Sequence, residues 1–365
     1  MSPASAYAPG RVELLGNHTD YNEGVVLAAA IDLGLTAAGI ARQDNLVVIT
    51  SRASGQQVQV SLGELEPPAD AHWARYPLGV VEQFARAGFA QGGFEAEISG
   101  DLPAGAGLAS SAALEVATAG LLMKLHELRL APLEVAKLCQ RAENDFVGVR
   151  SGLLDQVASI FGRAGYAVFL DFQTEEIRVL PFPGELALIV AVSGGKHDLL
   201  QSFYNERREE CAAAADALGA ESLREVTPDH LELAGGSLDP VLYRRAAHIV
   251  GENDRVWRAL AALEIGDAEV LGELMNASHE SSRTNFENST VELDELVTRA
   301  RALPGVLGAR LTGGGFGGAI VALVRANDAE DAAASLRVRG RAESGSTPQV
   351  FVCRPAEGAA ARWAR

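Results

Sequence analysis

Runs of Val, Ile, Leu and Ala alternate along the chain with stretches that repeat apolar residues at helical spacing. After a short lead-in over residues 1–10, the apolar runs of the first half predict strands over 11–15, 25–31, 33–41, 45–51, 57–61, 93–99, 166–170 and 177–180. Helical spacing predicts helices over 73–87, 111–128, 132–146 and 152–161. Ser151 is the expected N-cap of the last helix.

The second half repeats this mixture. Strands are expected over 186–192, 308–312, 319–325 and 349–354, and helices over 199–218, 240–262, 267–280, 291–302 and 329–338. Strands mixed with helices in both halves indicate an α+β or α/β architecture. Because 365 residues exceed a typical single core, two domains are expected. Pro181-Phe-Pro-Gly184 is the best boundary, which divides the chain into 1–183 and 184–365.

Composition and charge narrow the class of protein. Apolar residues make up 48% of the chain, which is typical of a folded protein with a buried core. The formal net charge of −17 argues against a nucleic-acid or anionic-membrane binder, so neither partner is expected. The three scattered cysteines fit a reducing compartment, and neither a signal peptide nor a membrane-length apolar run is found. We therefore expect a cytoplasmic protein.

A glycine-rich turn followed by two hydroxyls is the most informative stretch. It reads Asp101-Leu-Pro-Ala-Gly-Ala-Gly-Leu-Ala-Ser-Ser-Ala-Ala-Leu-Glu115 and runs into a strongly helical segment. Glycine lets the backbone approach a ligand, and a helix start presents free N–H groups and a positive partial charge. The stretch therefore predicts a phosphate site, with hydroxyls suited to Mg²⁺ or a phosphate oxygen. A glycine-rich turn capped by serine is the alternative, since the Gly-Lys-Ser/Thr of a common P-loop is absent.

Four polar groups, Arg11, Asn17, His18 and Asp20, lie within ten residues. A sugar offers adjacent hydroxyls that both donate and accept; a carboxylate can accept from two of them, and an amide or imidazole adds direction. A polar loop after a strand accounts for the same residues, because Asp and Asn favour turns. These residues alone leave both interpretations open.

Two carboxylates, Glu143 and Asp155, lie twelve residues apart on either side of a Gly148–Gly152 break. Carboxylates suit Mg²⁺, which prefers oxygen ligands, and a carboxylate facing a hydroxyl can take its proton during phosphoryl transfer. A solvated helix face for Glu143 and stabilisation of a first helical turn by Asp155 are the alternatives.

A second glycine loop, Gly313-Gly-Gly-Phe-Gly-Gly318, has five glycines in six positions. Turn chemistry alone rarely needs so many, so we expect its backbone to approach a ligand or another loop closely. Tyr204, in Tyr-Asn-Glu-Arg-Arg208, is compatible with an ordinary amphipathic helix.

Taken together, these stretches resemble the galactokinase family of the GHMP small-molecule kinases. The segment Pro9-Gly-Arg-Val-Glu-Leu-Leu-Gly-Asn-His-Thr-Asp-Tyr-Asn22 looks like that family's signature. Further ordered matches are 102–113, 140–144, 152–156, 204–211 and 311–318. The resemblance implies an α+β, two-domain GHMP kinase fold: an N-terminal mixed-sheet domain with helices and a ferredoxin-like C-terminal domain, with the site between them.

The resemblance also implies roles for individual residues. Arg11 and Asp155 match the positions that flank the hydroxyl accepting the phosphoryl group. The positions similar to the family's sugar contacts are His18, Asp20, Gly152 and Tyr204, together with Asn17. Those similar to its ATP contacts are Gly105, Gly107, Ser110, Ser111, Trp73 and Tyr76, the last two on the adenine side. Ser111 and Glu143 match the residues that hold Mg²⁺.

The sequence departs from the family pattern in three places, and the first of them leaves the identity of the sugar open. The signature normally reads Gly-Glu-His-Thr-Asp, and Asn17 replaces the Glu that contacts the sugar. Ala109 replaces the first of three serines, while Ser110 and Ser111 remain. The segment 284–289 reads Thr-Asn-Phe-Glu-Asn-Ser, where the family usually ends in Asp-Asp-Tyr-Glu-Val-Ser.

The function implied is an ATP- and Mg²⁺-dependent kinase that phosphorylates the anomeric hydroxyl of a hexose, with galactose as the first expectation. A kinase for an N-acetylated or acidic hexose is the first rival. A non-catalytic galactose sensor on the same fold is the second, which the presence of Ser111, Glu143 and Asp155 disfavours. We expect a monomer whose partners are a small sugar and ATP.

Overall fold

The computed structural model describes residues 2–89, 92–193, 200–338 and 348–363. A seven-stranded sheet forms the first half, in the order β4-β3-β5-β2-β6-β7, and β1 also pairs with β2. Its strands are β1 (Ala4–Leu15), β2 (Val25–Ala41), β3 (Leu46–Ser51), β4 (Gln57–Ser61), β5 (Phe94–Gly100), β6 (Tyr166–Asp171) and β7 (Ile177–Pro181). Since β3 and β5 pair in parallel and the other pairs are antiparallel, the sheet is mixed, as expected.

The expected lead-in over residues 1–10 is wrong, because β1 begins at Ala4 and pairs with Gly39 of β2. Ala6 and Ala8 are buried, whereas Tyr7 between them is half-buried and Ser5 before them is exposed. This is the alternation of a strand, but its buried positions are alanines. They lack the β-branched side chains by which strands are usually recognised in a sequence. β1 therefore carries the start of the segment 9–22 as part of a long hairpin with β2.

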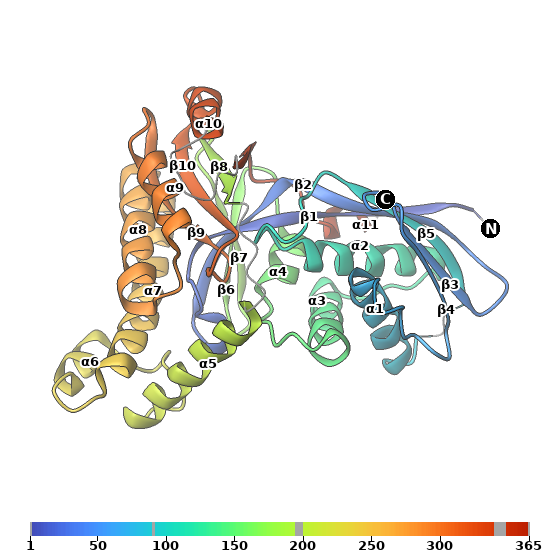
Figure 1. The fold of residues 1–365 in the computed structure, drawn as a ribbon, viewed down its shortest axis with the longest axis horizontal. Helices are drawn as coiled ribbons and strands as arrows, with labels where there is room; N and C mark the ends of the chain where they lie inside the picture. Colours follow the sequence, from blue (N-terminus) through green and yellow to red (C-terminus); the bar gives the residue numbers. More distant parts are fainter. Residues whose placement is uncertain (1, 90–91, 194–199, 339–347, 364–365) are drawn as a thin grey trace.

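Four helices of the described chain cover one face of this sheet (Figure 1). They are α1 (Arg75–Arg86), α2 (Ser110–Leu125), α3 (Pro132–Arg141) and α4 (Leu154–Phe161). α2 packs against β1 and β2, and every residue from Ala112 to Met123 is buried. A helix that is largely apolar and buried on all sides is a core helix. The core thus fixes the start of α2, and with it the glycine-rich turn that precedes the helix.

The second sheet has the order β11-β8-β10-β9 and is antiparallel throughout. Its strands are β8 (Leu186–Val192), β9 (Val306–Thr312), β10 (Ala319–Arg325) and β11 (Gln349–Cys353). In chain order this is 4-1-3-2, with helices after the first and third strands, which defines the ferredoxin-like arrangement. The expected fold class is confirmed.

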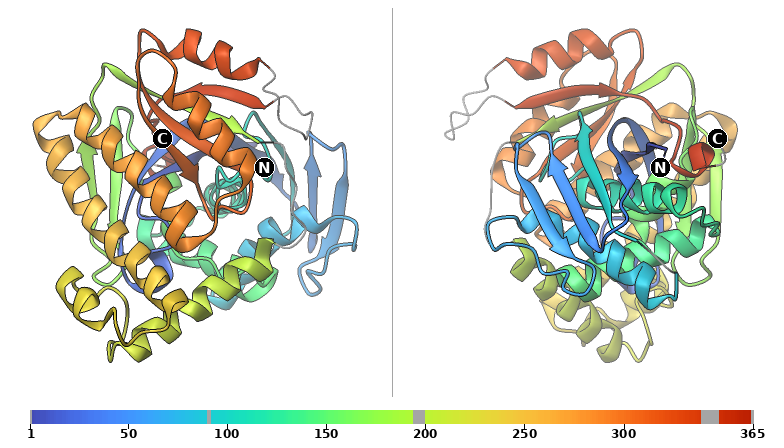
Figure 2. Two further views of the ribbon diagram at one scale, coloured as in Figure 1. Left: turned by 60° about the vertical axis from the view of Figure 1, so that its left-hand side comes forward. Right: turned by 90° about the vertical axis from the view of Figure 1, so that its right-hand side faces the viewer.

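The helical layer of the second half lies between β8 and β9. It consists of α5 (Leu200–Ala217), α6 (Pro228–Ala234), α7 (Pro240–Ile265), α8 (Ala268–Ser281) and α9 (Val291–Arg301). α7 and α8 pack side by side, and α8 and α9 contact β9 (Figures 1 and 2). α10 (Ala329–Arg337) follows β10, and α11 (Ala360–Trp363) ends the described chain. The sequence did not predict α6 or α11, which are short.

The chain passes from the first sheet to the second between Pro181 and Leu186. After β11 it returns to the first half: Ala356 donates its backbone N–H to Ala30, and Gly358 donates to Gly162, at 2.9 and 2.8 Å. We propose the division into 1–183 and 184–365 with one addition, that the segment after β11 packs with the first unit.

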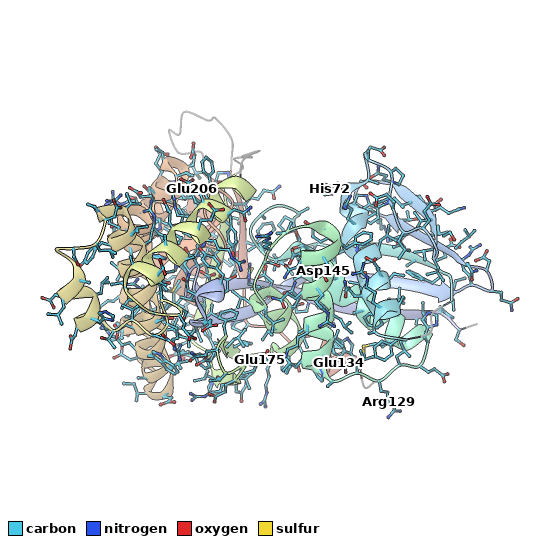
Figure 3. All side chains as sticks on the ribbon, turned by 90° about the horizontal axis from the view of Figure 1, so that it is seen from below. His72, Arg129, Glu134, Asp145, Glu175 and Glu206 are labelled. Carbon is cyan, nitrogen blue, oxygen red and sulfur yellow. The ribbon has the colours of Figure 1, made fainter. Side chains whose placement is uncertain are left out.

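Acidic side chains lie on the surface. Exposed examples on the underside are Glu134, Asp145, Glu175 and Glu206 (Figure 3). Cys139, Cys211 and Cys353 are buried, free thiols. Among the described residues, no helix combines the length and apolar character needed to cross a bilayer.

Candidate active site

A cleft of about 690 Å³ lies where the two sheets meet. Its walls come from β1 and the loop after it, the glycine-rich turn, residues 149–155, α5 and the loop 312–318. The residues predicted from the sequence that line it are Arg11, Asn17, His18, Asp20, Tyr76, Gly105, Gly107, Ser111, Glu143, Gly152, Asp155 and Tyr204. Ser110 and Trp73 are not among the lining residues; the Trp73 indole donates instead to Gln56 Oε1 at 2.8 Å.

Arg11 joins three parts of the cleft. Its backbone N–H donates to Leu108 O at 3.1 Å, and its Nη1 donates to Gly107 O at 2.7 Å. Its Nε and Nη2 lie 2.7 and 2.6 Å from Asp155 Oδ1. The Arg11 side chain is 7% exposed and that of Asp155 24%, so the pair is partly shielded from water. One guanidinium therefore ties the glycine-rich turn to the carboxylate expected to act on the substrate hydroxyl.

The first turn of α4 carries Asp155, but its predicted cap is wrong. The N-cap position is Leu153, without a side-chain hydrogen bond. Ser151 lies in the preceding loop and donates its hydroxyl to Glu143 Oε2 at 2.5 Å. The buried carboxylate competes successfully for this hydroxyl because a charged acceptor makes the stronger hydrogen bond.

Asp20 is a half-buried carboxylate facing two donors. Gly152 N–H and the Tyr204 hydroxyl both donate to its Oδ2, each at 3.1 Å. Burial raises the pKa of Asp20, the nearby charge of Asp155 raises it further, and the donors of Tyr21, Tyr204 and Gly152 act in the opposite direction. Burial, together with Asp20, raises the pKa of Tyr204 well above its usual value, so Tyr204 is a proton donor at neutral pH.

His18 is held as a neutral ring. Its Nε2 lies 2.9 Å from Gly314 O, and its Nδ1 lies 2.8 Å from the Tyr21 hydroxyl. Because a carbonyl only accepts, the geometry assigns the proton to Nε2. Burial lowers the pKa of His18 to about 4. Both ring nitrogens are thus engaged within the protein, and the ring packs against Phe286 and Tyr204.

Asn17 is 1% exposed, and its amide is engaged on both sides. Its Nδ2 donates to Glu13 Oε1 at 3.0 Å and to Gly313 O at 2.8 Å. Its Oδ1 accepts from Asn288 Nδ2 at 2.8 Å. The two amide hydrogens are therefore spent on protein acceptors.

The glycine-rich turn has the backbone expected of a phosphate loop. Gly105 and Gly107 have φ of +69° and +74°, and Ala109 before α2 is also left-handed at +58°. Ser111, in the first turn of α2, hydrogen-bonds to Glu143. Gln156 Nε2 donates to Glu143 Oε2 and to Glu115 Oε2, both at 3.1 Å. The turn thus leads directly to a hydroxyl and a carboxylate.

Some residues of this region were missed from the sequence. Glu115 is fully buried and lies four residues after Ser111, so helical spacing alone places the two on one side of α2. Ser151 and Gln156 also surround Glu143, although nothing in the local sequence pairs them with it. In the part of the chain that the structure describes, no three His, Cys, Asp or Glu side chains gather as a metal cluster.

The second glycine loop approaches the first, as expected. A Cβ added at Gly313 would lie 3.2 Å from Gly107 O, and one at Gly107 would lie 3.3 Å from Thr312 O. A Cβ at Gly315 would lie 2.3 Å from Asn288 O. Side chains at Gly107 and Gly313 would crowd the two loops, so these glycines let both loops form one wall, while Gly315 leaves room for Asn288.

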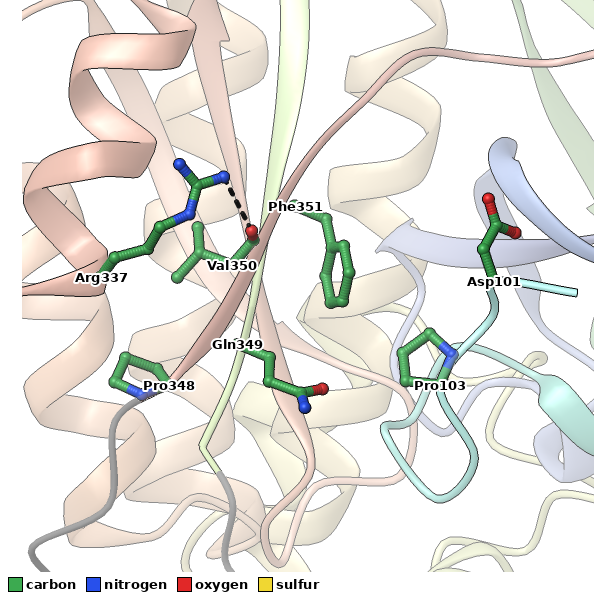
Figure 4. A pocket seen from close by; sticks show the side chains of 7 residues that line it. All are labelled: Asp101, Pro103, Arg337, Pro348, Gln349, Val350 and Phe351. Atoms are coloured by element: carbon green, nitrogen blue, oxygen red, sulfur yellow. Dashed lines mark hydrogen bonds between the residues drawn. The ribbon is translucent and has the colours of Figure 1, made fainter. Parts of the chain in front are cut away.

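A second hollow, of about 560 Å³, lies between the start of the glycine-rich turn and β11 (Figure 4). Its charged groups are already paired: Asp101 Oδ1 accepts from Gly34 N at 2.9 Å, and Arg337 Nη2 donates to Val350 O at 3.0 Å. The groups expected to act in phosphoryl transfer, Ser111, Glu143 and Asp155, line the larger cleft.

Comparisons with known proteins define the class. The chain matches the GHMP kinases N terminal domain over residues 75–163 and the GHMP kinases C terminal over residues 259–342. It also matches the galactokinase galactose-binding signature over residues 2–40. The structure of Methanococcus jannaschii mevalonate kinase shares the fold, with a TM-score of 0.71 at 20% identity over 98% of this chain and 99% of that one. The protein is a GHMP kinase.

The galactokinases are closer still in sequence. The chain is 41% identical over 356 residues to galactokinase from Roseiflexus sp. (strain RS-1), covering 96% of this chain and 91% of that protein. It is 39% identical over 360 residues to galactokinase from Homo sapiens, covering 96% and 90%. Lactococcus lactis galactokinase complexed with galactose matches with a TM-score of 0.91 at 33% identity, over 98% of this chain and 94% of that one. The chain belongs to the galactokinase family.

Proposed function

We propose that this protein transfers the γ-phosphoryl group of ATP to the anomeric hydroxyl of galactose, giving galactose 1-phosphate and ADP. Membership of the galactokinase family supports this reaction. The observation that carries it is Arg11, which contacts both Asp155 and the carbonyl of Gly107 in one cleft. The acceptor hydroxyl and the phosphate to be transferred must meet at such a point.

The chemistry asks for positioning more than for covalent help. The anomeric oxygen forms a new bond to the γ-phosphorus, and the bond from that phosphorus to the β-γ bridging oxygen breaks. The hydroxyl proton passes to the carboxylate of Asp155, and Arg11 holds that carboxylate in place. Asp20, Gly152 and Tyr204 orient the sugar, with Asp20 as an acceptor for its hydroxyls.

The phosphates of ATP bind at the turn containing Gly105 and Gly107, against the N-terminus of α2. Free N–H groups and the helix dipole favour an anion there. Because the whole chain has a net charge of −17, the attraction for the ATP phosphates must come from such local groups. Ser110 lies at the same helix start, and Tyr76 lines the cleft on the adenine side. Trp73 supports that side through its hydrogen bond to Gln56.

Ser111 and Glu143 suit Mg²⁺. This ion usually takes one or two carboxylates together with substrate phosphates, so one hydroxyl and one carboxylate beside a phosphate turn are a sufficient set. Burial raises the pKa of Glu143, while donors from Ser151, Gln156 and Ser111 favour its charged form. When bound, the ion neutralises phosphate charge.

The test is ADP release with ATP, Mg²⁺ and a panel of galactose, N-acetylgalactosamine and galacturonate, with phosphorus NMR of the product. Galactose should give the highest kcat/KM and an anomeric phosphate. Activity confined to another sugar of the panel would replace galactose as the substrate but keep the sugar kinase. Sugar binding without ADP release from any of the three would favour the sensor.

A further inference from the structure

Glu13 is a charged side chain on β1 that lines the cleft, although it is more than nine-tenths buried. Its side chain is 6% exposed. Arg310 Nη1 and Asn17 Nδ2 both approach its Oε1, each at 3.0 Å. Among the described residues no hydrogen bond reaches the other oxygen, Oε2. A carboxylate usually accepts more than two hydrogen bonds, so this oxygen has capacity for a donor in the cleft.

Arg310 explains why a carboxylate must sit at this point. It is fully buried, and Glu13 is its one ion-pair partner among the described residues. A buried guanidinium without a counter-charge is strongly unfavourable. The family signature supplies a Glu four positions later, where this chain has Asn17. Asn17 Nδ2 and Arg310 Nη1 approach the same oxygen of Glu13. The negative charge that the family places at position 17 is therefore supplied in this chain by Glu13, four residues earlier.

Asn17 is unsuited to bind the sugar through its amide N–H groups. Both hydrogens are donated to protein acceptors, and its oxygen already accepts from Asn288. The same contacts fix the Glu13 carboxylate from one side while Arg310 fixes it from the other. Asn17 thus positions a neighbouring acceptor whose second oxygen is open.

Resting on the proposed galactose kinase activity, we infer that Glu13 is a specificity-determining residue that accepts a hydrogen bond from one galactose hydroxyl through Oε2, with Asn17 as its positioning residue. Its charge favours a neutral hexose over galacturonate, because a second carboxylate would meet Glu13, Asp20 and Asp155 in the same cleft.

The experiment compares wild type and Glu13→Gln on galactose and on its 2-, 3-, 4- and 6-deoxy derivatives, omitting any that wild type does not phosphorylate. Loss of a charged acceptor should raise the galactose KM roughly 10- to 100-fold. For the deoxy sugar that lacks the bonded hydroxyl, the two proteins should have equal kcat/KM. Asp171→Asn is the control: it removes a buried carboxylate that accepts from Arg224 Nη2 at 2.8 Å outside the cleft lining, so its effect should be the same for every sugar.

A charge exchange tests the proposal even where Glu13→Gln fails to fold. Asn17→Glu alone sets two carboxylates against one guanidinium and should lose at least tenfold in galactose kcat/KM. The double variant Glu13→Asn/Asn17→Glu keeps a partner for Arg310 and should return galactose kcat/KM to within about fivefold of wild type. A folded double variant no better than Asn17→Glu, or an equal Glu13→Gln penalty on all sugars, overturns the inference. A wild-type protein that is inactive on galactose would instead overturn the proposed function, and this outcome is distinguishable because it requires no variant.

Discussion

Gly152→Ala tests the sugar side of the cleft because Gly152 touches Asp20 so closely. A Cβ at position 152 would lie 2.4 Å from Asp20 Oδ2 and 2.6 Å from Asp20 Cβ. Ordinary contacts begin near 3.4 Å, so the carboxylate must move by about 1 Å. That shift breaks the 3.1 Å hydrogen bond from Gly152 N–H and disturbs the one from Tyr204.

The expected cost follows from these contacts. A hydrogen bond to a charged group contributes about 1.5–3 kcal/mol, which corresponds to roughly 10- to 100-fold in KM for galactose if Asp20 no longer meets its hydroxyl. The KM for ATP should change less than about threefold, because the glycine-rich turn contacts Arg11 and not Gly152. Crowding of this kind also costs about 1–3 kcal/mol of folding stability.

The assay is steady-state kinetics with varied galactose and varied ATP, alongside thermal unfolding. Gly184→Ala is the matched control, since a Cβ there meets nothing within 4 Å. It should leave both KM values unchanged. A folded Gly152→Ala protein whose galactose KM lies within twofold of wild type would refute the placement of Asp20 against the sugar.

Three further outcomes are expected. Asp155→Asn should lower kcat by about 10²–10⁴ with calorimetric galactose binding retained; near-normal turnover would remove Asp155 from the reaction. Ser111→Ala and Glu143→Gln should each raise the half-saturating Mg²⁺ concentration by about tenfold while galactose KM moves less, and unchanged titrations in both would show that neither is a ligand. Burial lowers the pKa of His248 to about 3, so below about pH 6.5 the unfolded chain takes up a proton that the folded chain refuses. The urea-measured stability advantage of wild type over His248→Gln should therefore shrink by about 2 kcal/mol between pH 7.5 and pH 5; a constant gap would contradict a neutral buried ring.

Most of the fold could be predicted from sequence where local pattern and burial agree. The apolar run of β8 and the largely apolar α2 are recognisable because each is buried on every side. The part of β1 from Ala4 to Gly10 was not predicted, because alanines do not distinguish a strand from an irregular lead-in. α6 escaped because seven residues hold too few turns for a helical period.

The site was less accessible to sequence, for a different reason. Ser111 and Glu143 lie in recognisable motifs. The side-chain amide of Asn17, in contrast, hydrogen-bonds to Gly313 and Asn288, which are nearly three hundred residues away in the sequence. Glu13 reads as one polar position in a strand, and Arg310 as one in another. Only the meeting of β1 with β9 shows that they neutralise each other.

The contacts between β1 and the second half of the chain also hold the cleft in its shape. Thr312 Oγ1 accepts from Glu13 N at 2.9 Å and donates to Glu13 O at 3.2 Å, and Glu252 on α7 accepts from the backbone N–H groups of Gly16 and Asn17 at 2.8 Å. These contacts are buried, and removing one partner of such a bond leaves the other unsatisfied. The two halves are therefore joined directly behind the loop proposed to contact the sugar. A substitution there should alter sugar selection even where it touches no sugar, because the acceptors proposed to face the sugar are held by residues from the opposite half.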